Sequence, residues 1–327
     1  MKIGMMYDTP DMYDLEGDGR YYDFSSHASI MALSESFKRA GYEVHMIGNL
    51  EGLLKELKNS VFDSDIIFNT VEGVASRNRE GITPSFFEAF QIPYIGTDAY
   101  GLSTSLDKTR MKVIAQNLGI ATPKYVTFNT HREIIFGQKT ERDLNFPIII
   151  KPNFEGNSSG IRVVNSHAEF EEYVEYVINQ YGTEVLCEEF IRGMDLTVAL
   201  VGTGKDAKVI SVTAVGKQAI SKNPEYWLTT NEKLYGDYRR VPVDISEDIQ
   251  KLIENWSLLI YRSIGCRDYG RIDFRLGSDG IPYFIEINPI PGLSRFGAFG
   301  VTGDKEICYY DILSDIVKSA MKRYAML

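Results

Sequence analysis

The sequence predicts an α/β protein of three domains, with a parallel sheet in the first domain and an α+β arrangement in the last. The length of 327 residues suits two or three domains of roughly 150 residues each. Short apolar runs alternate with helical patterns through the first hundred residues, which is typical of a parallel sheet. Two strand-like runs around a turn signal indicate an antiparallel hairpin near the C-terminus.

Composition and charge argue against several classes of protein. The chain has 35 basic and 45 acidic residues, a net charge of −10, whereas a nucleic-acid-binding surface is normally basic. No apolar run approaches the roughly 18 residues that span a bilayer. The first twenty residues contain five acids and no apolar core, unlike a signal peptide, and the three cysteines lack CxxC spacing. We therefore expect a soluble, cytoplasmic protein that binds neither nucleic acid nor a membrane.

The first predicted domain, residues 1–98, has a strand–helix–strand rhythm. A helix is expected at 25–41, because Ile30, Leu33 and Phe37 recur at helical spacing before Gly41. The expected strands are 1–7, 43–48 and 65–70. Residues 92–108 are rich in Gly, Ser and Thr, and we interpret them as the connection out of this domain.

The second and third predicted domains cover residues 99–191 and 192–327. The expected elements of the second domain are helices at 108–119 and 168–182 and strands at 146–152 and 184–191. The expected elements of the third are strands at 196–201, 208–215, 271–276 and 281–288, a polar stretch at 217–240, a helix at 244–265 and a helix from about 307.

The predicted hairpin has the most informative polar pattern. A turn centred on Ser278 and Asp279 would place Arg271 opposite Glu286 and Asp273 opposite Phe284. Since side chains alternate between faces, one face would hold Arg271, Asp273, Glu286 and Asn288, and the other Ile272, Phe274, Leu276, Ile281, Tyr283, Ile285 and Ile287. Two carboxylates and an amide oxygen suit Mg²⁺. A solvated face with a cross-strand ion pair explains the same pattern equally well.

A second pattern follows the buried strand that ends at Lys151. The loop after it contains Gly156, Ser158 and Ser159, and such small residues let backbone amides approach phosphate while a lysine supplies charge. The loop matches neither GxxxxGK[ST] nor GxGxxG. Taken alone, it is better explained as a flexible hairpin.

Two weaker patterns point to a nucleotide. The strand end at 188–195 includes Glu188, Glu189, Ile191 and Asp195, which could offer backbone groups to adenine and a carboxylate to ribose. Lys108 is a candidate phosphate ligand at a helix start. Taken singly, an exposed strand end and a surface lysine are the simpler interpretations.

Together, and in this order, the segments resemble the ATP-grasp superfamily and, within it, the D-alanine–D-alanine ligase family. The resemblance covers roughly residues 65–320. The matching segments are IPYIGTD, SLDKTRMK, LGIATPKY, FPIIIKPNFEGNSSGI, EVLCEEFIRGMDLTVAL and YGRIDFRL…YFIEINPIPGLS.

The resemblance implies a three-domain ATP-grasp fold with ATP between the central and C-terminal sheets. By position, it implies phosphate contacts from Lys108, Lys151 and the loop residues Gly156, Ser158 and Ser159, and nucleoside contacts from Glu188, Glu189, Ile191 and Asp195. It further implies that two Mg²⁺ ions, or Mn²⁺ in their place, bind to Asp273, Glu286 and Asn288. Arg271 and the Gly292 amide would form the oxyanion site, and Ser158 and Lys233 would complete the catalytic set.

The sequence departs from the family pattern around the amino-acid substrate. The N-terminal Gly-Gly and Ser-x-Glu signature is absent, and Asp23 is the candidate substitute for its glutamate. VEGVASRNREG, which includes Glu72, replaces HGxxGEDG, Asn157 replaces the catalytic serine, and Gly297–Ala298 replaces a Ser-Leu pair. We hypothesise that the acidic, tyrosine-rich segment 8–23 and the segment 71–81 rebuild the pocket for a first substrate larger than D-alanine. A mobile surface loop is the equally weighted alternative.

The predicted function is that of an ATP-dependent carboxylate–amine ligase of the D-alanine–D-alanine ligase type. It would form a peptide bond through an acyl phosphate and release ADP and phosphate. One alternative is an amino-acid ligase for a different carboxylate and amine or a carrier-bound group. The other is a nucleotide-binding module without turnover, which would not need the oxyanion arginine. The identity and stereochemistry of the small amino-acid substrates and the oligomeric state are left open, a homodimer included.

Overall fold

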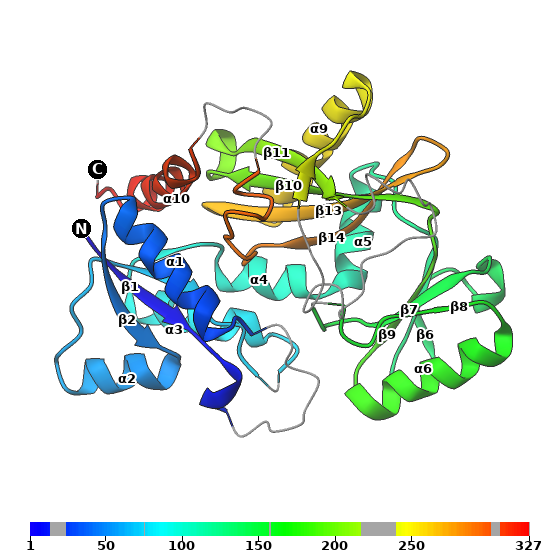
Figure 1. Ribbon diagram of the computed structural model, residues 1–327. Coiled ribbons are helices and arrows are strands. Elements are labelled where there is room, and N and C mark those ends of the chain that lie inside the picture. The colour runs from blue at the N-terminus through cyan, green and yellow to red at the C-terminus, as the bar shows by residue number, and fades with distance from the viewer. Residues whose placement is uncertain (14–23, 75, 157, 217–239, 302–307, 327) are drawn as a thin grey trace.

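The computed structural model describes residues 1–13, 24–74, 76–156, 158–216, 240–301 and 308–326. Asp23 and Lys233, like Asn157, lie outside these residues. The described chain contains three β-sheets, one of four strands and two of five, with helices packed around them (Figure 1). The expected α/β class with an N-terminal parallel sheet is confirmed.

The N-terminal sheet has the order β2-β1-β3-β4, and all of its pairs are parallel. Its strands are β1 (Lys2–Tyr7), β2 (Glu43–Gly48), β3 (Ile66–Thr70) and β4 (Tyr94–Ile95). Because β1 and β3 are parallel, their carboxyl ends meet at one edge of the sheet, where Tyr7 pairs with Thr70. This edge positions the residues that follow each strand.

Four helices surround this sheet: α1 (His27–Arg39), α2 (Leu50–Lys58), α3 (Arg79–Phe90) and, from the other end of the chain, α10 (Tyr309–Arg323). The Ser26 hydroxyl caps α1 by accepting a hydrogen bond from the Ser29 amide. The predicted stripe of Ile30, Leu33 and Phe37 is buried against the sheet. Since α10 packs into the same core, both termini lie on one side of the molecule (Figure 1).

The connection expected at 92–108 contains a helix that we did not predict. Helix α4 (Ala99–Leu106) begins after Asp98, whose carboxylate accepts a hydrogen bond from the Gly101 amide at 2.8 Å. Helix α5 (Lys108–Asn117) follows after Asp107, which caps it in the same way. The Gly, Ser and Thr content suggested an irregular segment, but the two capping aspartates and tertiary packing override weak helix propensity.

The central sheet has the order β6-β5-β9-β7-β8 and is antiparallel throughout. Its strands are β5 (Tyr125–Phe128), β6 (Ile134–Gly137), β7 (Ile148–Pro152), β8 (Arg162–Val164) and β9 (Val185–Glu189). Helix α6 (His167–Tyr181) covers one face and buries Phe170, Val174 and Val177. The opposite face of β7 and β9 is therefore available to a site.

The C-terminal sheet has the order β12-β11-β10-β13-β14 and is also antiparallel. Its strands are β10 (Gly193–Val201), β11 (Lys208–Val215), β12 (Arg240–Pro242), β13 (Tyr269–Gly277) and β14 (Pro282–Asn288). Helix α9 (Glu247–Ser263) begins three residues later than predicted, because the Ser246 side chain caps it. Helices α5 and α9 pack on this sheet around Ile272, Phe274 and Phe284.

The register predicted for the β13–β14 hairpin is wrong by two residues. Arg271 pairs with Asn288, and Asp273 pairs with Glu286. The Gly277 amide bonds the Ile281 carbonyl, so the loop has three residues, with Gly280 at a φ of 80° that favours glycine. A β-bulge between Asp273 and Phe274 adds the second residue of shift.

The shift of two before the bulge preserves the polar face, whereas the shift of one between the bulge and the loop alters the apolar face. The predicted grouping of Arg271, Asp273, Glu286 and Asn288 on one face is confirmed. The predicted apolar positions beyond the bulge are wrong: Ile281 is exposed, Ile285 faces a cavity, and Phe284 is fully buried instead. Tyr283 is half-buried, and its hydroxyl donates to Asp279.

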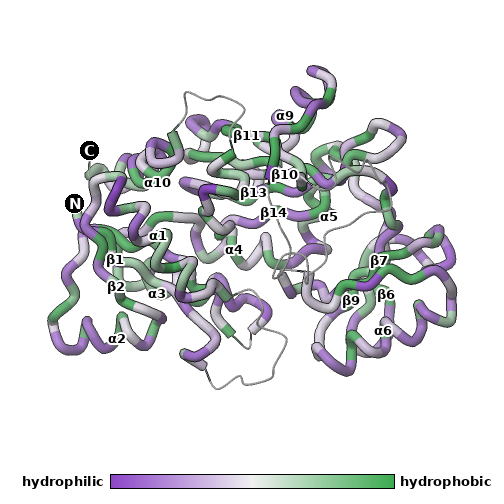
Figure 2. The backbone as a smooth tube through the Cα atoms, viewed as in Figure 1, coloured by the Kyte–Doolittle hydropathy of each residue, from purple (hydrophilic) through white to green (hydrophobic). Residues whose placement is uncertain are grey.

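Hydropathy follows this layering. Figure 2 shows hydrophobic residues concentrated along β1 and β2, whereas hydrophilic and hydrophobic residues alternate along α6. That alternation is typical of a helix with one buried and one solvated side. None of the helices in the described part of the chain has the length and apolar character that crossing a membrane requires.

Candidate active site

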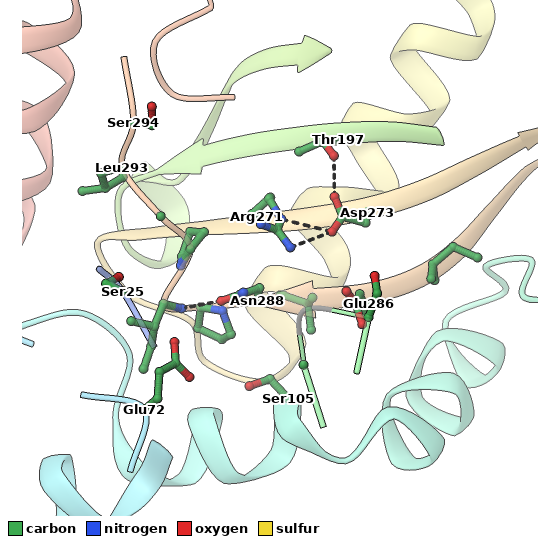
Figure 3. Close-up of a pocket in the computed structure, with 18 of the residues that line it drawn as sticks. Ser25, Glu72, Ser105, Thr197, Arg271, Asp273, Glu286, Asn288, Leu293 and Ser294 are labelled. Carbon is green, nitrogen blue, oxygen red and sulfur yellow. Dashed lines mark hydrogen bonds and ion pairs between the residues drawn. The ribbon is translucent and has the colours of Figure 1, made fainter. Parts of the chain in front are cut away.

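A cavity of about 910 Å³ lies between the N-terminal, central and C-terminal sheets, and the close-up in Figure 3 shows part of its wall. Most of the predicted site residues line it. They are Glu72, Lys108, Lys151, Gly156, Ser158, Ser159, Glu188, Asp195, Arg271, Asp273, Glu286, Asn288 and Gly292. Residues far apart in sequence thus meet on one surface, as the ordered set of motifs predicted.

The polar face of the β13–β14 hairpin forms one wall of the cavity. The Arg271 guanidinium donates from Nε to Asp273 Oδ2 at 3.0 Å, and its second contact with the same oxygen is 2.9 Å (Figure 3). The Thr197 hydroxyl of β10 donates to the other oxygen of Asp273. The Asn288 side-chain oxygen accepts the Ile290 amide at 2.9 Å, which orients the loop that leads to Gly292.

The hairpin face offers oxygen ligands of the kind that Mg²⁺ prefers. Asp273, Glu286 and Asn288 provide two carboxylates and one carboxamide, and Mg²⁺ commonly completes its coordination with water and substrate phosphates. Across the described ranges, no three His, Cys, Asp or Glu side chains are grouped to hold a metal ion. The donor set fits a metal ion that also coordinates substrate phosphates.

The wall formed by β7 and β9 contains a buried ionic triad. Glu188 Oε1 is 2.5 Å from Lys151 Nζ, and Glu188 Oε2 is 2.5 Å from Lys112 Nζ. Burial raises the pKa of Glu188, but the two ammonium groups outweigh burial and hold this pKa at about 2. Burial lowers the pKa of Lys112 despite the attraction of Glu188. The carboxylate is thus ionised across the physiological range.

Lys108 and the Gly-rich loop lie next to this triad. The Lys108 ammonium donates to the Glu155 carbonyl and lies 3.7 Å from Glu286 Oε2. The loop turns sharply, with the Ser159 amide bonded to the Gly156 carbonyl at 2.9 Å. Gly160 has a φ of 66°, and a Cβ there would lie 2.8 Å from the Pro152 ring. A lysine and a compact loop therefore face the same part of the cavity.

Of the residues proposed from the sequence to bind adenine and ribose, some line the cavity and others do not. Asp195 lines the cavity and bonds the Arg275 guanidinium at 2.6 Å. The side chain of Glu189 does not line the cavity, because strand alternation turns it away from Glu188 to accept the Asn145 amide at 2.9 Å. Ile191 is not among the lining residues either, and its carbonyl accepts a hydrogen bond from Arg275.

Glu72 and Asp8, two acids of the segments expected to form the first-substrate pocket, have different positions. Glu72 follows β3 and points into the cavity (Figure 3). Asp8, one of the acids in the segment expected to rebuild the pocket, is buried and accepts the amides of Glu72 at 3.1 Å and Gly73 at 2.8 Å. Burial raises the pKa of Asp8, against the effect of these amides. Asp8 therefore supports the turn that presents Glu72.

The analysis of the sequence missed Lys112 and Arg275, and it included Arg79 in the segment 71–81 without predicting the contact that this residue makes. Lys112 follows Lys108 by four residues in a predicted helix, a spacing that places both on one helix face. Arg275 continues the alternation of Arg271 and Asp273 along β13. The buried Arg79 donates to the Phe154 carbonyl at 2.7 Å and so ties α3 to the Gly-rich loop; no local pattern pointed to this contact.

Comparisons with known proteins match the chain to one family. A family model described as D-ala D-ala ligase C-terminus matches residues 114–318. A D-alanine–D-alanine ligase of Xanthomonas axonopodis is 30% identical over 80% of this chain and 78% of its own length. The corresponding ligase of Aquifex aeolicus is 29% identical over 88% of this chain and 92% of its own length.

Solved structures share the fold. The D-alanine–D-alanine ligase of Bacillus anthracis complexed with ATP has a TM-score of 0.75 and 20% identity, covering 100% of this chain and 99% of that one. VanG D-Ala:D-Ser ligase from Enterococcus faecalis has a TM-score of 0.72 and 20% identity, covering 98% of this chain and 99% of that one. The expected fold family is thereby confirmed, and with the family match it follows that the chain belongs to the D-alanine–D-alanine ligase family.

Proposed function

We propose that this protein is an ATP-dependent ligase that joins a carboxylate to an amine; its relatives named D-alanine–D-alanine ligase support this proposal. The reaction would proceed through an acyl phosphate and release ADP and phosphate. The observation that carries the proposal is the polar face of the β13–β14 hairpin, which opens onto the same cavity as Lys108 and Lys151. Binding of a nucleotide alone does not require an oxyanion arginine on that face.

The nucleotide binds between the central and C-terminal sheets in this proposal. Lys108, Lys151 and the amides around Ser158 and Ser159 contact the phosphates, since compact ammonium groups and backbone N–H groups suit phosphate oxygens. Asp195 accepts a hydrogen bond from a ribose hydroxyl. Glu188 and the backbone from Glu189 to Ile191 border the adenine. The side chains of Lys108, Lys151 and Asp195 already face the cavity.

Asp273, Glu286 and Asn288 hold two Mg²⁺ ions in this proposal, and Mn²⁺ suits the same oxygen ligands. Metal ions bound to these residues would supply positive charge to offset the charge on the phosphoryl group being transferred. Arg271 is already oriented by its two contacts with Asp273. It would donate with the Gly292 amide to the oxygen that becomes negative when the amine attacks.

The protein also has to exclude water, because an acyl phosphate hydrolyses. Ser158 lies on the cavity side of the Gly-rich loop, and Arg79 anchors that loop to α3. These contacts support a closing role for the loop. We keep Lys233 as the proposed lid lysine on the resemblance alone.

The first substrate is an amino acid whose ammonium pairs with Glu72 in this proposal. A zwitterion in a closed pocket needs an anionic partner, and Glu72 is the carboxylate that β3 and Asp8 present there. The wall formed by α1 and the residues before it contains the small side chains Ser25, Ala28, Ser29 and Ala32, next to the larger Ile30 and Leu33. The small side chains leave room for an amino acid larger than D-alanine, which supports the second candidate, a ligase for a different carboxylate and amine or a carrier-bound group. Asp23 stays a proposal from the sequence alone.

We also propose that the domains comprise residues 1–98, 99–191 and 192–327. The end of β4 at Ile95 and the start of α4 at Ala99 support the first boundary. The passage from β9 in the central sheet to β10 in the C-terminal sheet supports the second.

The test is ADP release by the purified protein with ATP and Mg²⁺, screened against single and paired D- and L-amino acids. We expect release only with a specific pair, together with a product of the summed mass minus water by mass spectrometry. Release with D-alanine alone would identify the D-alanyl-D-alanine reaction, and release with another pair would identify the second candidate. Tight ATP binding with no release against any amino acid would contradict a ligase.

A further inference from the structure

Lys112 is a buried cation next to the proposed nucleotide site, yet it does not line the cavity. Its side chain is 0% exposed. Its ammonium contacts Glu188 Oε2 at 2.5 Å and the Thr122 hydroxyl at 2.9 Å, and it lies 5.7 Å from the centre of the Tyr125 ring. A fully buried ammonium is costly unless it is paired. Such a group needs a reason beyond packing, because a methionine of similar length would fill the same space.

The partner of Lys112 is shared with the proposed phosphate ligand. Each oxygen of Glu188 has its own lysine, Lys151 on one side and Lys112 on the other. The triad as a whole has a net charge of +1. If Lys112 were absent, the Lys151 ammonium and the Glu188 carboxylate would form a neutral ion pair inside the cavity wall. That pair would present little charge to a phosphate.

The triad also determines the free-energy cost of moving the Lys151 ammonium away from Glu188. A shift of the Lys151 ammonium toward a phosphate in the cavity would lengthen its contact with Glu188 Oε1. With Lys112 in place, Glu188 keeps one ionic partner when Lys151 leaves. Without Lys112, the same movement would leave a buried carboxylate unpaired, which is strongly unfavourable.

We infer that Lys112 is a positioning residue that holds Glu188 in place so that Lys151 can exchange it for the phosphates of the nucleotide. The inference rests on the proposed nucleotide site and adds to it a residue that touches no substrate. Helix α5 makes the arrangement, because it presents Lys108 directly to the cavity and Lys112 one turn further on, behind the wall.

The decisive experiment compares ATP with adenosine by calorimetry on the full chain. The readout is the ratio of the adenosine Kd to the ATP Kd, which isolates the contribution of the phosphates. We expect Lys112→Met to lower this ratio at least tenfold while the adenosine Kd changes by less than threefold. Lys139→Met, which removes an exposed lysine of the central domain, is the matched control and should leave the ratio unchanged.

A second variant separates positioning from general damage. In Lys112→Met/Glu188→Gln, no buried carboxylate holds Lys151, so the ratio should return to within threefold of the wild-type value. If Lys112→Met does not fold, the double variant is measured alone against wild type. A ratio that is unchanged in Lys112→Met, or that stays at least tenfold low in the double variant, overturns the inference.

Failure of the proposed function would look different. If wild-type protein binds ATP no more tightly than adenosine, or if Lys151→Ala leaves the ratio unchanged, the nucleotide site itself is wrong and the inference falls with it. If Lys151→Ala lowers the ratio but Lys112→Met does not, only the role of Lys112 is wrong.

Discussion

Replacing Glu188 with glutamine should destabilise the protein strongly, and the effect should depend on pH. Glutamine keeps the shape of the side chain but removes the charge that pairs with Lys112 and Lys151, two buried ammonium groups. Removing one partner of a buried ion pair costs about 3–5 kcal/mol. The pKa of Glu188, lowered from 4.5 to about 2, gives a similar value of about 3 kcal/mol at roughly 1.4 kcal/mol per unit.

The sign of the pH dependence follows from the direction of that pKa. Because the pKa is lower in the folded state, ionised Glu188 stabilises the fold fully above pH 4.5, and this contribution is lost as pH falls toward 2. Wild type should therefore lose about 3 kcal/mol across that window through Glu188, and Glu188→Gln should not. The difference in stability between the two proteins should shrink as the pH falls.

Urea unfolding at several pH values between 7 and 3 measures this difference. Glu189→Gln is the matched control, because the Glu189 carboxylate is next to Glu188 in sequence but is half-buried and accepts hydrogen bonds from Asn145 instead of pairing with a lysine. We expect the control to cost less than about 1.5 kcal/mol, the range of one ordinary hydrogen bond. A loss below about 1 kcal/mol in Glu188→Gln at pH 7, or a difference that does not vary with pH, would refute the reasoning.

Three further predictions concern catalysis and binding. Glu286→Gln should reduce ADP release roughly 100-fold, because metal clamping on the hairpin face carries transition-state stabilisation; turnover near the wild-type rate would mean that this face is only solvated. Lys151→Ala should weaken ATP binding roughly tenfold in calorimetry, since it removes a charged contact to phosphate, and an unchanged affinity would contradict a phosphate site. Glu72→Gln should raise the KM of the first amino acid and leave the KM of ATP unchanged; equal effects on both would place the ammonium site elsewhere.

The β13–β14 hairpin shows which structural features local sequence patterns predict and which they do not. The alternation of Arg271 and Asp273, and of Glu286 and Asn288, was sufficient to predict a shared polar face, because a period of two survives a register shift of two residues. The register itself was not predictable. It depends on a three-residue loop with Gly280 in the left-handed region and on a bulge after Asp273, and tertiary packing selects both.

Lys108 and Lys112 show what local sequence patterns do not predict. Helical spacing places Lys108 and Lys112 on one side of α5, but nothing local indicates that one reaches a cavity and the other a buried carboxylate. Burial of the Lys112 ammonium requires α5 and β9 to meet, and these elements are separated by about seventy residues in the chain. The same applies to Asp8, whose role became visible only when β1 and β3 paired in parallel.

The sequence by itself determined the class of the fold, the order of the motifs and a set of site residues, most of which line the cavity. The fold class and the polar hairpin face follow from periodicity and turn residues, which are local properties, whereas the rest of the site set follows from the family resemblance of the ordered motifs. The tertiary structure alone decided which of those side chains face the cavity and which support others. Glu188 points toward the cavity and Glu189 away from it, and Glu72 lines the cavity while Asp8 holds the turn that contains Glu72. The physical reason is that burial and ion pairing depend on contacts between distant segments, and those contacts exist only once the three sheets have packed together.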